Sequence, residues 1–224
     1  MVRRASAEAI GTAFLLIAVV GSGIMAERLA AGNVALALLA NSVATGAALL
    51  ALILTFGQIS GAHFNPAVTL AAAMQGTMAW KEVPAYMLAQ VGGAFAGVAA
   101  AHLMFGLPLF FAARHVRFGY GLLWSEFLAT FGLLAVIWGC GRFRASRVPF
   151  AVAAYICGAY WFTSSTSFAN PAVAMARSAS DTFAGIRPAD VPAFVVAQFA
   201  GAITATLCFR WLLPGAATAQ GDAS

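Results

Sequence analysis

Two short segments decide the fold: Ser60–Val68 reads SGAHFNPAV, and Phe168–Val173 reads FANPAV. In each, Asn stands directly before Pro inside an apolar stretch of only about ten residues, 65–74 and 170–180. Asn caps helices well, and Pro suits the first helical position because its missing N–H has no intrahelical partner there. We therefore predict two short helices that begin at these motifs, each rising about 15 Å, or half a bilayer.

The sequence around the motifs is repeated as well. Residues 82–94, EVPAYMLAQVGGA, match residues 190–202, DVPAFVVAQFAGA, at seven of thirteen positions. A Glu-x-x-x-Thr pair occurs at Glu8–Thr12 and again at Glu126–Thr130. The matches follow the same order in both halves, so we predict a duplicated unit with repeats at about 1–111 and 118–213.

Composition restricts the class of protein. The chain has 224 residues, of which 62% are hydrophobic and 8% are charged, and its mean hydropathy is +0.88. Soluble domains contain about 25% charged residues, and disordered chains are poor in apolar residues, so both classes are excluded. Six apolar stretches are long enough to span a bilayer, at about 7–29, 34–57, 83–105, 118–139, 149–167 and 190–213.

These patterns predict an all-α membrane protein with six transmembrane helices and two re-entrant half-helices, forming a single channel domain over 1–224. Each repeat holds an odd number of spans, so the two copies should lie inverted across the membrane, as in many transport proteins. The first stretch resembles a signal peptide, but Glu8 within it and the later spans favour a transmembrane helix. We expect no soluble domain.

The distribution of basic residues predicts the orientation of the chain in the membrane and argues against a nucleic-acid partner. With both termini inside, basic residues number seven at the inner ends of the spans and four at the outer ends, the bias expected of a multi-pass protein of the cell membrane, such as the bacterial inner membrane. The net charge of +5 is not clustered on one face, which argues against a nucleic-acid partner. Scattered histidines and cysteines predict no metal site, disulfide frame or cofactor; they are His63, His102, His115, Cys140, Cys157 and Cys208.

The two half-helices should meet near the membrane midplane with their N-termini facing each other. Each N-terminus carries roughly half a positive charge, which would repel cations and protons but not neutral hydroxylated molecules. Glu8 and Glu126 are costly at this depth and need partners. They could relay ions, or they could brace the loops before the half-helices; His63 could likewise brace a loop or act as a ligand.

These features resemble the major intrinsic protein family, the aquaporins and aquaglyceroporins. The resemblance rests on Asn65-Pro66-Ala67 and Asn170-Pro171-Ala172, the Glu-x-x-x-Thr pairs and the repeated Gln-x-x-Gly-Ala of the third and sixth spans. It covers nearly the whole chain. It implies an hourglass pore in each monomer, a homotetramer in the lipid bilayer and passive flow of small neutral solutes, with no enzymatic activity.

The chain departs from the usual pattern at the outer constriction. Counting from the motifs, the four filter positions are Thr45, Gly158, Ser167 and Val173, although loops could shift the first two. None is aromatic or Arg, whereas the usual second motif continues with Arg. The resemblance therefore implies a wide filter. It is similar to that of bacterial aquaglyceroporins associated with arsenic resistance, whose second motif continues into a run like Ser180–Phe183.

The sequence thus favours a passive channel for arsenite and related neutral metalloid acids, then glycerol, urea and water. Arsenite at neutral pH is an uncharged trihydroxide similar in shape to glycerol. The alternatives are a general water and small-solute channel and an ion-coupled secondary transporter. Arg177 remains open: it could cap an outer vestibule, partly replace the missing charge or form a surface pair.

Overall fold

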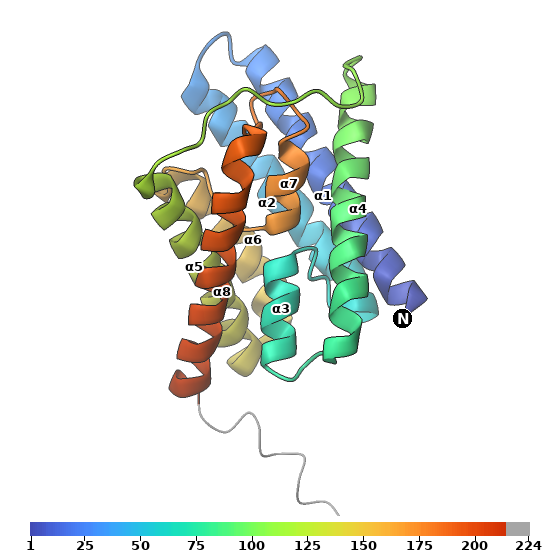
Figure 1. Ribbon diagram of the computed structural model, residues 1–224, viewed down its shortest axis with the longest axis vertical. Helices are drawn as coiled ribbons and strands as arrows, with labels where there is room; N and C mark the ends of the chain where they lie inside the picture. The colour runs from blue at the N-terminus through green and yellow to red at the C-terminus, as the bar shows by residue number, and fades with distance from the viewer. Residues whose placement is uncertain (214–224) are drawn as a thin grey trace, which may run out of the picture.

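The computed structural model describes residues 1–213; the last residues of the predicted channel domain, 214–224, lie outside this range. The described chain is almost entirely helical (Figure 1). The six long helices are α1 (Val2–Leu29), α2 (Val34–Ser60), α4 (Val83–Met104), α5 (Tyr120–Phe143), α6 (Val148–Phe162) and α8 (Val191–Leu212). Two short helices, α3 (Pro66–Met74) and α7 (Pro171–Arg177), follow the Asn-Pro motifs. Short 3₁₀ turns precede α4, α6 and α8: η1 (Trp80–Glu82), η2 (Ala145–Arg147) and η3 (Pro188–Asp190). The predicted fold class is confirmed.

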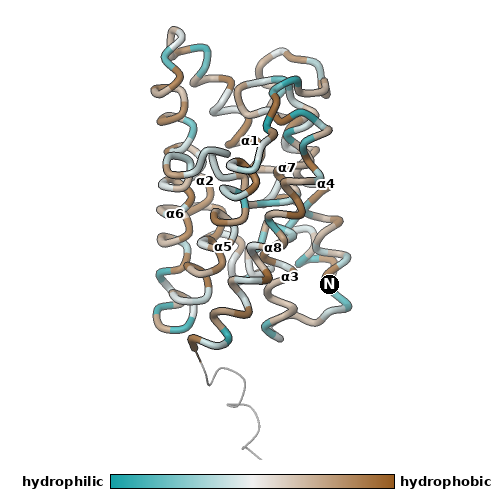
Figure 2. Tube along the Cα trace, turned by 60° about the vertical axis from the view of Figure 1, so that its left-hand side comes forward, coloured by the Kyte–Doolittle hydropathy of each residue, from teal (hydrophilic) through white to brown (hydrophobic). Residues whose placement is uncertain are grey.

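The outward surface of the helix bundle suits a membrane. Five of the long helices are long and apolar enough to cross a bilayer by length and composition. Many large apolar side chains on these helices are exposed, and Figure 2 shows hydrophobic residues along most of the helix lengths. Water would not tolerate so many exposed apolar groups, but lipid tails do.

Five helix boundaries lie three or more residues from the prediction. Two helices run on beyond it: α2 ends at Ser60 rather than at 57, and α5 ends at Phe143 rather than at 139. Helix α6 has 15 residues and ends at Phe162, five residues before the predicted end, because the backbone turns to an extended conformation at Thr163, with φ −111° and ψ 137°. Helix α7 ends at Arg177 rather than at 180. Helix α1 begins at Val2 rather than at 7, since a polar first turn can extend an apolar helix beyond the hydrocarbon.

Small residues allow the long helices to pack closely within each half. Helix α1 packs against α2 and α4, α5 packs against α6 and α8, and α2 packs against α6 between the halves. A Cβ atom on Gly93 or Gly97 of α4 would overlap the α1 backbone at Ala9 or Ala13. A Cβ atom on Gly201 of α8 would overlap the carbonyl of Phe127 on α5. These contacts hold the bundle around the two short helices.

The two short helices approach the centre of the bundle from opposite ends (Figure 1). Helix α3 lies in the lower half of the view and α7 in the upper half, with the ends that carry Asn65 and Asn170 facing each other. We call the end with the α4–α5 and α7–α8 connections the upper end, and the end with residue 1 the lower end. The order of helices, two long, one short and one long, occurs twice along the chain.

Candidate functional site

The two Asn-Pro-Ala motifs bind each other across the centre of the molecule. The Asn65 Nδ2 donates to the carbonyl of Ala169 at 2.7 Å, and the Asn170 Nδ2 donates to the carbonyl of Phe64 at 2.8 Å. Each Asn Oδ1 caps its own helix by accepting the N–H two residues later, at 2.9 and 3.0 Å. Pro66 and Pro171 begin the helices, and Ala67 and Ala172 are fully buried.

A cavity of about 210 Å³ runs past both motifs. Most of its wall is apolar and comes from the long helices, while a few polar groups lie along it. These polar groups include Thr45, His63, Asn65, Ser167, Asn170 and Arg177. A narrow apolar passage with sparse polar groups can carry small hydroxylated molecules one after another.

Three of the four filter positions counted from the motifs line this cavity: Thr45, Ser167 and Val173. Gly158 does not belong to the lining; a Cβ atom there would lie 3.7 Å from the Phe162 ring. Helix α6 instead contributes Tyr160, whose hydroxyl donates to the Thr45 Oγ1 at 3.3 Å.

Counting twelve residues back from Asn170 had selected Gly158, but the residue of α6 that lines the cavity beside Thr45 is Tyr160. Positions two residues apart on an α-helix point about 200° apart, so an error of two in the α6–α7 loop selects the opposite face. The phenol of Tyr160 belongs to the cavity wall, with its hydroxyl beside Thr45, so an aromatic side chain lies next to one of the expected filter positions.

Glu8 lies at the centre of a buried cluster at the lower end of the cavity. Its Oε1 accepts the Ser60 hydroxyl at 2.6 Å and the backbone N–H of His63 at 3.0 Å. Its Oε2 accepts the backbone N–H of Phe64 and the Gln90 Nε2, both at 2.7 Å. Phe64 has a left-handed φ of 50°, so the carboxylate satisfies backbone that no helix or strand could satisfy.

Glu126 makes the matching contacts at the upper end. Its Oε1 accepts the N–H of Phe168 and its Oε2 accepts the N–H of Ala169, both at 2.9 Å. The Gln198 Nε2 donates to the same Oε2 at 2.6 Å. Ala169 also has a left-handed φ, 47°. Each motif is thus preceded by two residues whose N–H groups bind a fully buried carboxylate from another helix.

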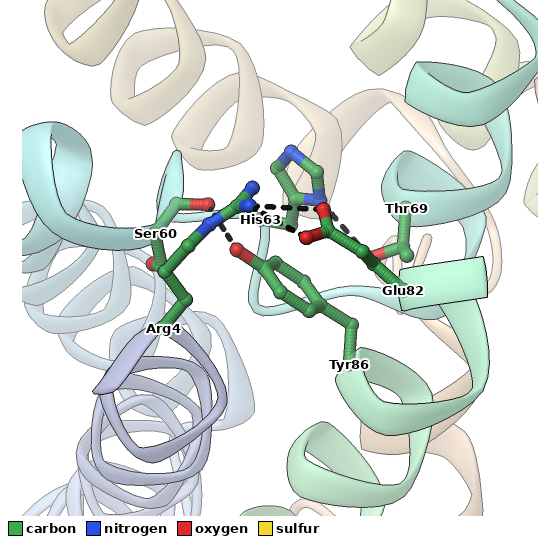
Figure 3. Close-up of polar contacts among 6 residues, drawn as sticks. All are labelled: Arg4, Ser60, His63, Thr69, Glu82 and Tyr86. Atoms are coloured by element: carbon green, nitrogen blue, oxygen red, sulfur yellow. Dashed lines mark hydrogen bonds and ion pairs between the residues drawn. The ribbon is translucent and has the colours of Figure 1, made fainter. Parts of the chain in front are cut away.

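His63 lies at the lower mouth, within the polar group drawn in Figure 3. Its Nδ1 is 3.1 Å from the Thr69 Oγ1, and its ring lies 5.5 Å from the ring of Tyr86. Tyr86 donates to the Ser60 carbonyl at 2.8 Å, and the guanidinium of Arg4 lies 5.3 Å above the Tyr86 ring. His63 therefore both contacts α3 and lines the cavity.

The upper end holds two buried arginines, and the guanidinium groups of both lie near the Phe168 ring. The Arg177 Cζ lies 3.4 Å from the Phe168 ring centroid, and the Arg117 Cζ lies 4.9 Å from it. Arg177 is only 3% exposed and lines the cavity. The sequence left its role open, and it left out Phe168 and Arg117; the one available signal was a basic residue four positions after Val173, on the same face of α7.

The site shows no arrangement for metal chemistry. Within residues 1–213, no three His, Cys, Asp or Glu side chains gather closely enough to hold a metal ion. Glu8 and Glu126 each accept hydrogen bonds from nearby donors.

Comparisons with known proteins agree with this geometry. The family model described as Major intrinsic protein matches residues 1–163. The chain is 54% identical over 213 residues to aquaglyceroporin AqpS of Rhizobium meliloti (strain 1021), covering 95% of this chain and 91% of that protein. It is 37% identical over 146 residues to aquaporin NIP1-1 of Zea mays, covering 62% of this chain and 49% of that protein. In fold it is similar to the X-ray structure of the aquaglyceroporin from Plasmodium falciparum, with a TM-score of 0.70, 20% identity and coverage of 95% and 97%.

Proposed function

Because this chain belongs to the major intrinsic protein family, we propose that it is a passive membrane channel for small neutral hydroxylated solutes, with arsenite and glycerol favoured. The observation that carries the proposal is the cavity that passes both Asn-Pro-Ala motifs between two facing helix N-termini. Its relatives are named as aquaporins and aquaglyceroporins, which are channels and not enzymes.

The two motifs supply a barrier to cations at the centre of the passage. Each helix N-terminus carries roughly half a positive charge, and the two face each other across the Asn65 and Asn170 amides. One N–H of each amide binds a carbonyl, and the other, which has no partner within residues 1–213, can donate to a solute oxygen. A neutral molecule with hydroxyl groups exchanges its water contacts for these donors, whereas a cation is repelled.

The proposed filter is the ring of Thr45, Tyr160, Ser167 and Val173. Val173 stands where the family pattern has Arg, so the ring lacks a long side chain beside the second motif. The hydroxyls of Thr45, Tyr160 and Ser167 offer polar contacts to a solute in the passage. We infer that the ring accepts solutes at least as broad as glycerol: arsenite as its trihydroxide, glycerol and urea, and also water.

Passive flow, rather than ion coupling, is supported by the surroundings of the two buried carboxylates. Within residues 1–213, the hydrogen bonds to the side chains of Glu8 and Glu126 come from Ser60 at the end of α2, from backbone N–H groups of the loops before the motifs, and from Gln90 and Gln198. Such contacts suit loop supports. We therefore assign Glu8, Glu126 and, through Thr69, His63 to bracing the loops.

We also propose how the protomers assemble and how they are oriented in the membrane. We expect a homotetramer in the bacterial inner membrane, with both termini inside and with the repeats 1–111 and 118–213 inverted relative to each other. The upper end then faces outward. Chemical cross-linking in native membranes, read by electrophoresis, would show bands up to four protomers.

The test is solute flux in proteoliposomes. Vesicles with the protein should swell faster than empty vesicles in arsenite, glycerol and urea, at rates that neither a pH gradient nor a protonophore changes. Swelling no faster than that of empty vesicles would refute the channel proposal. Uptake that a protonophore abolishes would favour the coupled transporter instead.

A further inference from the structure

Arg177 lies in the wall of the passage directly beyond the filter. It is the last residue of α7 and stands four positions after Val173, so the two side chains share one face of the helix. Both line the cavity. Its Nε donates to the carbonyl of Ala184, and its guanidinium lies against the Phe168 ring. These contacts hold a long cationic side chain in place at the upper mouth.

The charge of Arg177 has no counter-ion at hand. In the part of the chain that the structure describes, no carboxylate oxygen lies within 4 Å of its guanidinium nitrogens. Arg117, which also lies near the Phe168 ring, differs: its side chain donates to the carbonyls of Gly185 and Ser165 at 2.8 and 3.1 Å, and it does not line the cavity. Arg117 is therefore a structural support, whereas Arg177 faces the passage.

Another polar group in the cavity wall lacks a hydrogen-bond partner within the described residues. The hydroxyl of Ser167 is buried and makes no hydrogen bond within residues 1–213, yet Ser167 lines the cavity. A buried hydroxyl without a hydrogen-bond partner costs free energy unless a solute or a water molecule forms a hydrogen bond with it. The Ser167 hydroxyl and the terminal nitrogens of Arg177 can both donate to the oxygen of a passing solute.

We propose that Arg177 supplies the positive charge of the outer constriction, one helical turn further from the motif than residue 173. The small side chain at residue 173 then sets the width of the ring, and Arg177 sets its charge. The channel can admit broad neutral solutes and still repel cations. This inference rests on the proposed function as a neutral-solute channel.

Arg177 can exclude cations because of the charge of its guanidinium and because of the apolar walls around it. An Arg side chain remains protonated at neutral pH, so the guanidinium of Arg177 carries its charge under the conditions of the assay. In a narrow passage with apolar walls, a fixed charge acts on ions far more strongly than it would in water. Neutral trihydroxides and glycerol meet only its N–H donors.

The test compares cation leak with neutral flux in the same vesicles. R177Q should raise the leak of potassium and protons at least about tenfold over wild type, while glycerol still passes. Tenfold corresponds to about 1.4 kcal/mol of barrier. The matched control is R114Q, which removes a cation from the same end of the molecule. The Arg114 side chain is 90% exposed and pairs with Asp181, so R114Q should leak no more than wild type.

Two further variants complete the experiment. V173R/R177Q returns the charge to the usual position, so it should restore cation exclusion and slow glycerol. R177K keeps the charge and should exclude cations as wild type does, which preserves the test if R177Q fails to fold. An R177Q channel that conducts glycerol but leaks no more cations than wild type would overturn the inference, and so would an R177K channel that leaks. Absence of glycerol flux in wild type would instead refute the proposed function.

Discussion

Replacing Glu8 by Gln tests whether the buried carboxylate braces the loop before the first motif. The side chain accepts four hydrogen bonds, two on each oxygen. A Gln side chain keeps one acceptor oxygen and turns the other into an NH₂ group. If the oxygen stays with Ser60 and His63, the new NH₂ faces the Phe64 N–H and the Gln90 amide, which are donors themselves.

The expected loss follows from those two bonds. Hydrogen bonds to charged groups contribute about 1.5–3 kcal/mol each, so two of them account for about 3–6 kcal/mol. Total domain stability is only about 5–15 kcal/mol. Rotation of the Gln90 amide, whose Oε1 has no partner within residues 1–213, would recover part of the loss by offering an acceptor to the new NH₂. We therefore expect a large fall in thermal stability and in the yield of folded protein.

The assay is thermal unfolding in detergent, followed by loss of the folded peak in size-exclusion chromatography. The matched control is Glu27→Gln, because Glu27 lies on the same helix and is exposed. Glu8→Gln should unfold many degrees below wild type, and Glu27→Gln should not differ from it. Any folded Glu8→Gln protein should still conduct glycerol passively. Equal unfolding temperatures in the two variants would refute the bracing argument.

Three further outcomes are expected. Val173→Arg should narrow the ring, so that arsenite and glycerol permeation fall several-fold and water permeation falls less in stopped-flow light scattering; unchanged rates would mean that residue 173 does not set the width. Gly201→Val should push α8 away from the Phe127 carbonyl and lower the unfolding temperature by overpacking worth roughly 1–3 kcal/mol, whereas Gly92→Val, with open space around it, should not. The backbone N–H and guanidinium of Arg114 lower the pKa of the Asp181 carboxyl below its ordinary 3.8, so the contact should persist until pH falls below that lowered value. Arg114→Gln should raise this pKa in an NMR titration, and an unchanged value would show that the pair is absent in solution.

The sequence by itself determined the class of fold and the position of its short helices. Asn before Pro starts a helix for local reasons, a cap and a missing N–H, and both short helices begin where those reasons place them. Apolar stretches of bilayer length mark the long helices for an equally local reason. The repeated Glu-x-x-x-Thr and Gln-x-x-Gly-Ala patterns contain the buried Glu and Gln side chains that lie beside the loops before the two motifs.

The tertiary structure alone decided which side chains meet at the constriction. A count of residues back from the motif does not show the path of the α6–α7 loop. A count that is wrong by two residues selects Gly158 instead of Tyr160, and these two residues lie on opposite faces of α6. Nor could the sequence show that Arg177 is buried, because its surroundings come from Phe168 before α7 and Ala184 after it. Whether a basic residue at a helix end lies in water or in a channel wall depends on the segments that fold back over it.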